Sequence, residues 1–303
     1  MATLLCFGFG YSARHYIAQF GARFDRVVAT VRNSEKADMI NADNAVEALV
    51  FAGAPNPAVS DLLARCDALL VSTPPGEAGD PVLAAFSDAL ARVQRLQSVV
   101  YLSTVGVYGD RQGAWVDETS ELHAATTRGR ARVQAETAWR ALGTQRGEGR
   151  PSVAVLRLAG IYGPGRSALT QVANGTARRI IKPGQVFNRI HVADIARTID
   201  AALAQHASEI FNVSDDVPAP PQDVIRFAAE LLNVPVPAEI PFAEAAKNLS
   251  PMALSFYADC RRVRNDRIKR ELGVTLRFPS YREGLRAIHA ETMHSLSPLA
   301  GEA

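Results

Sequence analysis

The sequence predicts an α/β protein built on a doubly wound parallel sheet. At its N-terminus an apolar run, residues 4–7, leads directly into glycines, and a helical pattern follows at once. Short apolar runs then alternate with helical patterns through the first 165 residues. Such alternation is typical of a parallel sheet whose strands are joined by right-handed helical crossovers.

The strands and helices follow from the apolar patterns and the turn residues between them. Helices are expected from Pro81 and from Pro221, where proline suits the first helical position. Asp194 is expected to cap another helix, and Asn265 is expected to cap a short helix that ends at residue 272. Residues 280 and 283 are expected to form a capping box for the last helix. A further helix is expected over 131–142. Strands are expected over residues 4–7, 26–31, 48–51, 67–73, 98–104, 152–158 and 211–214.

The alternation of expected strands and helices divides the chain into two parts. Residues 1–165 are expected to form a dinucleotide-binding, Rossmann-like domain, to which residues 190–215 return. Residues 166–189 and 216–303 are expected to form a smaller C-terminal substrate-binding lobe, because proline-rich stretches interrupt the alternation there. A length of 303 residues suits one nucleotide-binding domain with a smaller satellite.

Composition excludes several classes of partner. The 33 basic and 31 acidic residues are interleaved and give a net charge of +2, so neither nucleic acid nor a membrane surface is an expected partner. The three cysteines lie far apart and match no zinc or disulfide spacing, so no metal is expected. With no signal peptide and no apolar run near the ~18 residues of a membrane span, we expect a cytoplasmic protein.

The glycine turn after the first strand is the expected cofactor site. Gly8 allows a sharp turn, Gly10 leaves room for a pyrophosphate against bare backbone, and Ala13 allows close packing of helix on strand. Tyr11 and Ser12 stand in the first helical turn, where free N–H groups favour a diphosphate. These five residues are the predicted dinucleotide contacts.

Two further strand ends complete the predicted cofactor site. Ser72 and Thr73 end a buried strand at the sheet edge where ligands bind. Arg32 follows the second strand, where NAD-preferring sites carry an acid, and an arginine there accommodates a 2′-phosphate. The sequence therefore predicts NADP as cofactor, and the alternative is a solvent-facing arginine.

The chain resembles the extended short-chain dehydrogenase/reductases, the NAD(P)-dependent epimerase/dehydratase family. The likeness covers nearly the whole chain, in the family's order, and implies its fold. It is carried by the segments Ser-Thr-Val-Gly-Val-Tyr-Gly (103–109), Val-Leu-Arg-Leu-Ala-Gly-Ile-Tyr-Gly-Pro-Gly (155–165), Ile-His-Val-Ala-Asp (190–194), Phe-Asn-Val (211–213), Glu-Leu-Gly (271–273) and Glu-Gly-Leu (283–285).

The same resemblance implies catalytic positions, and this chain departs from them. Thr104 takes the place of the family's Ser/Thr, which orients the substrate oxygen, and Asp80 falls near its asparagine. The family's Tyr-x-x-x-Lys pair is replaced by Arg128 and Arg132. A guanidinium stays protonated, so Arg128 cannot relay a proton as a phenol does, whereas Arg132 can still hold ribose or phosphate.

Other candidates for the missing proton donor are close in sequence. Tyr108 is the first of these and is taken as a catalytic candidate, with Tyr162 and His123 beside it. Packing roles are the alternative for the two tyrosines, and a solvent-facing position is the alternative for the histidine.

Departures from the family's motifs weaken the case for a nucleotide-sugar substrate. The Asp-Glu pair of the family's sugar dehydratases is Val105 and Gly106 here, and the two diphosphate arginines of its nucleotide-sugar members are Phe187 and Asn248. Positive charge gathers instead at arginines 128, 130 and 132, which favours either an anionic ligand or a solvated helix start.

Three functions stay open. The first is an NADP(H)-dependent oxidoreductase acting on a small, anionic or carbonyl-bearing substrate. The second is a non-catalytic NADP(H) sensor, favoured by the loss of the tyrosine and lysine, and the third is a nucleotide-sugar epimerase. Family members often dimerise through the helix that here spans 131–142, and its small-residue face permits a homodimer.

Overall fold

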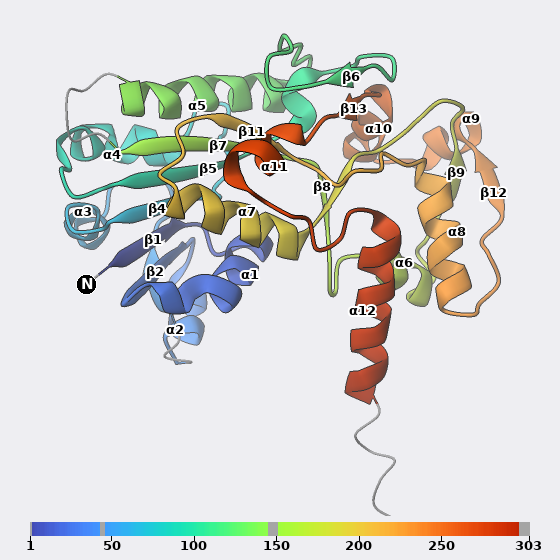
Figure 1. Cartoon of the computed structure of the whole chain (residues 1–303), viewed down its shortest axis with the longest axis horizontal. Coiled ribbons are helices and arrows are strands. Elements are labelled where there is room, and N and C mark those ends of the chain that lie inside the picture. Colours follow the sequence, from blue (N-terminus) through green and yellow to red (C-terminus); the bar gives the residue numbers. More distant parts are fainter. Residues whose placement is uncertain (1, 43–45, 145–150, 297–303) are drawn as a thin grey trace, which may run out of the picture.

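The computed structural model describes residues 2–42, 46–144 and 151–296. Its centre is a seven-stranded sheet with strand order β11-β7-β5-β4-β1-β2-β3, all neighbours parallel (Figure 1). The predicted doubly wound α/β fold is therefore confirmed. The strands are β1 (Thr3–Phe7), β2 (Arg26–Val31), β3 (Glu47–Val50), β4 (Ala68–Val71), β5 (Ser98–Thr104), β7 (Ser152–Leu158) and β11 (Ile210–Val213).

Helices cover both faces of this sheet (Figure 1). One face packs against α1 (Tyr11–Phe20), α7 (Val192–Ala204) and α11 (Asp266–Leu272), and α2 (Ser34–Ala42) lies beside β3. The other face packs against α3 (Pro57–Leu63), α4 (Pro81–Arg92) and α5 (Thr127–Thr144). Because both faces are buried, the strands read in the sequence as continuous apolar runs.

The smaller lobe faces the carboxyl ends of the sheet strands (Figure 1). Its core joins α6, α8 and α12 through Leu169, Phe227 and Leu285. The helices are α6 (Ala168–Ala173), α8 (Pro221–Leu231), α9 (Phe242–Ala245), α10 (Pro251–Ala258) and α12 (Tyr281–Leu296). Parallel strand pairs also lie outside the central sheet: β8 (Gly160–Tyr162) with β10 (Arg189–His191), β9 (Arg179–Ile181) with β12 (Glu239–Pro241), and β6 (Trp115–Val116) with β13 (Arg262–Val263). Short 3₁₀ turns span Gly21–Arg23 (η1), Val105–Tyr108 (η2) and Ala246–Asn248 (η3).

One predicted helix cap is wrong. The cap of α7 is His191, whose Nδ1 accepts a hydrogen bond from the Ala193 N–H at 3.2 Å. Asp194 lies inside the first turn, fully buried, and accepts from the backbone N–H groups of Arg277 (2.7 Å) and Phe278 (3.0 Å). Its carboxylate therefore ties the segment before α12 to α7, a long-range contact that the local pattern does not reveal.

Two other predicted caps have different outcomes. Asn265 stands at the N-cap of α11 without a side-chain cap bond, since its amide donates to the Ser214 carbonyl oxygen at 2.8 Å. Ser280 accepts from the Arg282 N–H at 3.1 Å and donates its hydroxyl to the Glu283 carboxylate, so the two predicted residues pair at the start of α12 through their side chains.

The small-residue face predicted on α5 is largely occupied within the chain. Ala131 and Ala135 are buried, and α5 packs on β5 and β7 there, whereas Ala138 is exposed. Trp139, fully buried on the same helix, donates to the Asp80 carboxylate at 3.1 Å, and that carboxylate also caps α4.

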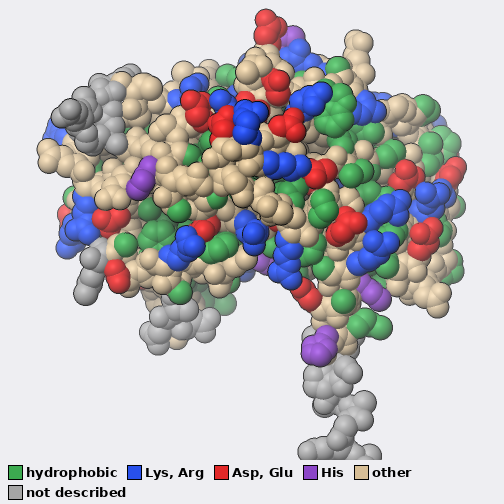
Figure 2. Space-filling model, in the orientation of Figure 1, with side chains coloured by type: hydrophobic (Ala, Val, Ile, Leu, Met, Phe, Trp, Pro, Cys, Tyr) green, Lys and Arg blue, Asp and Glu red, His purple; other side chains and the backbone are tan. Residues whose placement is uncertain are grey.

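Acidic and basic side chains are interspersed on the face shown in Figure 2. Among the described residues no helix is long and apolar enough to cross a bilayer. In the same part of the chain no three His, Cys, Asp or Glu side chains gather as a metal site.

Candidate functional site

The glycine turn stands at the carboxyl edge of the sheet, directly after β1. Gly8 has φ +93°, and a Cβ there would lie 2.7 Å from the Ser72 hydroxyl oxygen. The Gly8 N–H donates to the Thr30 hydroxyl at 3.0 Å, which fixes the turn against β2. Both the backbone angle and the close approach require glycine at this position.

Gly10 is open where Gly8 is crowded. It caps α1 in an extended conformation (φ −87°, ψ −170°), and no atom lies within 4 Å of a Cβ built on it. Ser12 and Ala13 are buried, Ala13 completely, so the start of α1 sits tightly on the sheet. The first N–H groups of α1 thus border open space, as a pyrophosphate site requires.

Ser72 and Thr73 support the turn from the neighbouring strand end. The Ser72 hydroxyl lies 3.1 Å from the carbonyl oxygens of Phe7 and Gly8, so its hydrogen-bonding capacity is used within the protein. The Thr73 N–H donates to the Phe7 carbonyl oxygen at 3.1 Å, and the Thr73 hydroxyl has no partner among the described residues.

Arg32 stands one position beyond β2, next to β1 in the sheet. Its side chain is exposed and has no hydrogen bond or ion pair within the described ranges 2–42, 46–144 and 151–296. The guanidinium is therefore available to a ligand at this edge.

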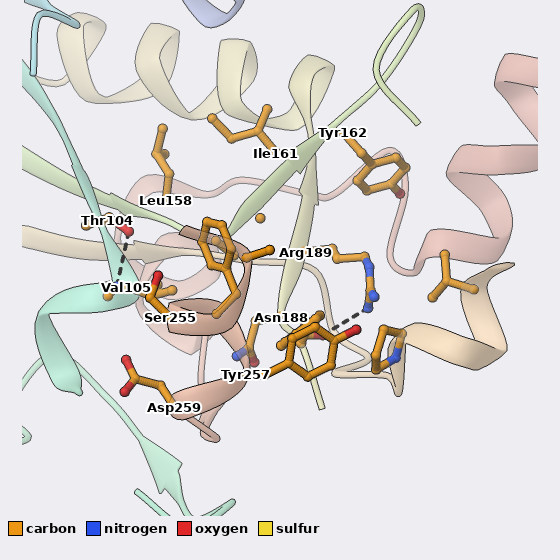
Figure 3. Close-up of a pocket in the computed structure, with 18 of the residues that line it drawn as sticks. Thr104, Val105, Leu158, Ile161, Tyr162, Asn188, Arg189, Ser255, Tyr257 and Asp259 are labelled. Carbon is orange, nitrogen blue, oxygen red and sulfur yellow. Dashed lines mark hydrogen bonds between the residues drawn. The ribbon is translucent and has the colours of Figure 1, made fainter. Parts of the chain in front are cut away.

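A cavity of about 1030 Å³ lies between the sheet edge and the smaller lobe (Figure 3). Thr104, the last residue of β5, lines it, and its hydroxyl oxygen accepts from the Gly106 N–H at 3.1 Å. The cavity adjoins the glycine turn, because the Tyr11 hydroxyl donates to the Pro164 carbonyl oxygen (2.9 Å) and the cavity residue Arg166 lies over the Tyr11 ring (5.6 Å).

The arginines of α5 occupy different places. Arg132 lines the cavity but is tied to β5, since its Nη1 donates to the Leu102 carbonyl oxygen at 2.6 Å and to the Tyr101 hydroxyl at 3.2 Å. Arg128 also lines the cavity, is exposed, and makes no side-chain bond with any described residue. Arg130 bonds the loop before the helix at the Ala125 carbonyl oxygen (2.5 Å) and lies outside the cavity lining.

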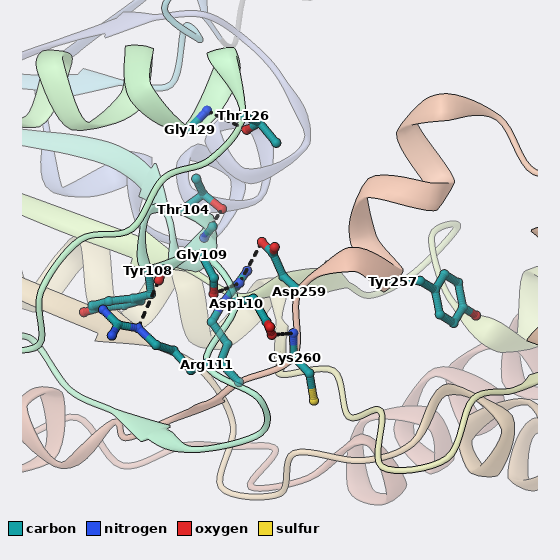
Figure 4. Close-up of polar contacts among 12 residues, drawn as sticks. Thr104, Tyr108, Gly109, Asp110, Arg111, Thr126, Gly129, Tyr257, Asp259 and Cys260 are labelled. Carbon is teal, nitrogen blue, oxygen red and sulfur yellow. Dashed lines mark hydrogen bonds and ion pairs between the residues drawn. The ribbon is translucent and has the colours of Figure 1, made fainter.

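The charged side chains that line the cavity are mostly positive. Among the described residues its lining holds a single carboxylate, Asp259, which pairs with Arg261 at 2.9 Å. Arg261 also donates to the Gly109 carbonyl oxygen (2.6 Å), and the Asp110 carboxylate accepts from the Cys260 N–H (2.8 Å), so this wall is pinned to the loop after Tyr108 (Figure 4). The arginines that line the cavity are 128, 132, 166, 178, 189 and 261.

The structure does not bring the candidate proton donors to Thr104. Tyr108 is fully buried and absent from the cavity lining; its hydroxyl donates to Asn212 (2.7 Å) and accepts from Arg157 (2.9 Å). Burial raises the pKa of Tyr108 despite that guanidinium. His123 is exposed and bonds Glu121 at 3.1 Å.

Tyr162 does line the cavity, but its hydroxyl is engaged. It donates to the Ser280 carbonyl oxygen at 3.3 Å, and burial raises the pKa of the phenol further than nearby Arg189 lowers it. The ring packs edge-on against His191, with centroids 5.1 Å apart.

A buried ion pair lies behind Tyr108. Arg157 and Glu136 are 2% and 3% exposed, and the guanidinium donates to the carboxylate through Nη2 at 2.7 Å and Nε at 3.1 Å. The Ser103 hydroxyl donates to the same carboxylate at 2.5 Å. This network joins β5, β7 and α5 directly beneath Thr104.

Sequence reasoning missed the cavity residues of the smaller lobe. Arg189 in β10, Tyr257 in α10 and Tyr281 in α12 all line the cavity. They are far apart in sequence and match none of the motifs considered, so only the packing of the lobe brings them together. A charged residue at the start of a short strand, as Arg189 is in β10, does not by itself indicate a ligand site.

This fold defines a class of protein: Rossmann-like α/β proteins with a separate lobe over the carboxyl edge of a parallel sheet. Residues 81–214 of the chain match the model of the NAD dependent epimerase/dehydratase family. The family is NAD-dependent, and similar structures hold either NAD or NADPH.

Two curated relatives match part of the chain. The 3-diazoavenalumate denitrifying reductase of a Streptomyces species is 31% identical over 139 residues, which cover 43% of this chain and 45% of that protein. Protein YeeZ of Escherichia coli K12 is 32% identical over 161 residues, 50% of this chain and 54% of that protein. The chain spans about half the length of the curated relatives it matches.

Solved structures match over nearly the whole chain. A functionally unknown conserved protein from Silicibacter pomeroyi is 46% identical, with a TM-score of 0.85 and coverage of 96% of this chain and 99% of that one. The dTDP-glucose 4,6-dehydratase of Bacillus anthracis in complex with NAD shares the fold at 14% identity (TM-score 0.76, 97% of each chain). The human epimerase family protein SDR39U1 with NADPH does so at 18% identity (TM-score 0.70, 95% of this chain and 99% of that one).

Proposed function

We propose that this chain is an NADP(H)-dependent oxidoreductase that acts on a small anionic substrate. The observation that carries the proposal is the cavity beside the glycine turn, whose described lining holds six arginines and one carboxylate, itself paired. Opposite charge in a partly closed cavity concentrates an anionic substrate there.

The cofactor would lie along the strand ends of the sheet. Gly10 and the N-terminus of α1 would hold the pyrophosphate, and the free guanidinium of Arg32 would pair with a 2′-phosphate. Tyr11, Ser12, Thr73 and Arg132 are the further proposed cofactor contacts, whereas Gly8, Ala13 and Ser72 shape the turn.

The bound nicotinamide supplies or accepts a hydride. Thr104 would orient the substrate oxygen with its hydroxyl, and Arg128 would hold a negative group of the substrate at the mouth of the cavity. Neither residue is a proton donor of the family's type, because a guanidinium does not release its proton near neutral pH and a threonine alone is a weak acid. The proton that completes a carbonyl reduction would therefore come from solvent at the cavity mouth, where Arg128 is exposed. Tyr108 has a structural role in this proposal, since its hydroxyl is engaged away from the cavity.

The name of the Streptomyces relative, a reductase, supports the redox assignment. A non-catalytic NADP(H) sensor is the second candidate. The exposed, unpaired side chain of Arg128 where the family has its proton-relaying tyrosine favours it.

The test is NADPH consumption with a panel of carbonyl compounds that bear a carboxylate or phosphate, each paired with a neutral amide. We expect turnover of anionic members, and an increase of about tenfold in KM for Arg128→Met, the loss of one charge-assisted contact. Arg140→Met is the matched control, because Arg140 is exposed on the same helix outside the cavity lining.

The outcomes separate the candidates. NADPH binding without turnover of any compound would contradict the oxidoreductase and favour the sensor. Turnover of UDP-glucose without net cofactor consumption would contradict both and point to an epimerase.

A further inference from the structure

The cavity has a second positively charged end, at β10, away from the sheet edge. Figure 3 shows Arg189 well separated from Thr104, with its guanidinium between Tyr162 and Tyr257. Its Nη1 donates to the carbonyl oxygens of Phe187 and Ala219, both at 3.0 Å. These two bonds fix the orientation of the guanidinium.

The other donors of this side chain have no partner. Within the described residues, Nε and Nη2 of Arg189 make no hydrogen bond or ion pair, and neither is among the fully buried polar atoms. An arginine remains protonated, and a largely desolvated cation without an anion is costly. Nε and Nη2 together offer two parallel N–H groups, the arrangement that a carboxylate accepts from.

The carboxyl group of Asp215 interacts with Arg189 electrostatically but does not serve as that anion. Asp215 donates its backbone N–H to the Arg189 carbonyl oxygen at 2.6 Å, but the two side chains form no ion pair. One Asp215 carboxyl oxygen is buried without any described partner. Burial raises the pKa of Asp215 to about 8 although Arg189 lowers it, so near neutral pH the carboxyl does not neutralise the guanidinium.

The walls around Arg189 are apolar and flat. Phe187 lies 5.9 Å from the guanidinium carbon and packs edge-on against Tyr257, with ring centroids 5.3 Å apart. Met252 and Phe256, one turn apart on α10, line the same cavity and are 58% and 61% exposed. Large apolar side chains exposed at a cavity indicate an apolar ligand surface.

We propose that Arg189 binds the carboxylate of the substrate, and that the aromatic walls hold a flat apolar body between this carboxylate and Thr104. The proposal deepens the proposed function and rests on it only in taking this cavity as the substrate site. It defines the substrate class as an aromatic or conjugated carboxylic acid whose reacting group lies at the opposite end from the carboxylate.

The test uses two probe acids of different length, 4-formylbenzoate and 4-formylcinnamate, each with its neutral amide. Calorimetry in the presence of NADPH measures their binding to the full chain. We expect at least one acid to bind wild type about tenfold to hundredfold more tightly than its amide, the range for one charge-assisted hydrogen bond, because the amide oxygen can still accept the other bond. Arg189→Met should abolish that preference and leave amide and NADPH binding unchanged.

Two control variants show whether a loss of acid binding in Arg189→Met comes from the lost carboxylate contact or only from a structural change. Arg189→Lys keeps the charge and one bond to the carbonyl oxygens but loses the paired donors, so it should retain only part of the acid preference. Arg178→Met removes an exposed arginine from the same cavity lining and should lower the acid preference far less than Arg189→Met does. An equal loss in Arg178→Met would show a diffuse field rather than a carboxylate site, and would overturn the proposal.

The outcomes distinguish a failure of the carboxylate site from a failure of the proposed oxidoreductase function. Acid binding that depends on Arg189 without NADPH consumption would support the carboxylate site and contradict the oxidoreductase. Equal consumption of NADPH with acids and amides would contradict the carboxylate site alone. Failure of both acids to bind wild type would also overturn it.

Discussion

Replacing Gly10 by valine should abolish dinucleotide binding while the fold survives. The extended conformation of Gly10 (φ −87°, ψ −170°) suits valine, and a Cβ there meets no atom within 4 Å. Losing glycine at a helix N-cap destabilises the folded state, whereas valine reduces the conformational freedom of the unfolded chain and so favours folding. We therefore expect the free energy of unfolding to change by no more than about 1 kcal/mol.

The binding loss is larger because the side chain enters the space of the pyrophosphate. A phosphate oxygen held by a backbone N–H lies about 2.9 Å from the nitrogen, too close to share the site with a valine methyl. Losing two charge-assisted hydrogen bonds costs about 3 to 6 kcal/mol, roughly a hundredfold to ten-thousandfold in affinity.

Calorimetric titration with NADPH, beside urea unfolding of each protein, measures both quantities. Gly8→Ala is the contrasting variant, because alanine is strained at φ +93° and its Cβ would meet the Ser72 hydroxyl at 2.7 Å. That variant should lose about 1–3 kcal/mol of stability. Wild-type NADPH affinity in a folded Gly10→Val protein would refute the placement of the cofactor at this turn.

Two further predictions concern buried charges. Arg157→Met leaves the Glu136 carboxylate buried without its cation, and should lower the free energy of unfolding by about 3–5 kcal/mol; an unchanged urea midpoint would contradict this. Asp215 has a folded pKa of about 8 against an ordinary value of 3.8, so its contribution to stability is complete below about pH 4 and is lost as the pH rises through about 8. Asp215→Asn should remove that loss, and parallel stability curves for the two proteins between about pH 5 and about pH 9 would argue against it.

The sheet was predictable because its strands are buried on both faces. A short run rich in β-branched and aromatic residues, such as the one within residues 98–104, indicates a covered strand, and β5 has those bounds. The glycine turn was equally predictable, since Gly8 needs its conformation whatever the rest of the chain does.

The side chains whose partners are distant in sequence were not predictable. Tyr108 stands four residues from Thr104, yet its hydroxyl is taken by Asn212 and Arg157 from other strands. The sequence around Asp194 fits a helix cap, but its carboxylate accepts hydrogen bonds from the backbone N–H groups of residues 277 and 278 instead. Arg189 joins the cavity through the packing of the lobe, for which no local pattern exists.

The central claim is that the sheet edge holds a dinucleotide whose 2′-phosphate meets Arg32. The most direct measurement is calorimetric titration of the wild-type chain and of Arg32→Ala with NADPH and with NADH. A charge-assisted pair to the phosphate contributes about 1.5–3 kcal/mol, so wild type should bind NADPH roughly tenfold to hundredfold more tightly than NADH. Arg32→Ala should lose this difference and keep its NADH affinity. Equal affinity of the wild-type chain for the two cofactors would contradict the claim.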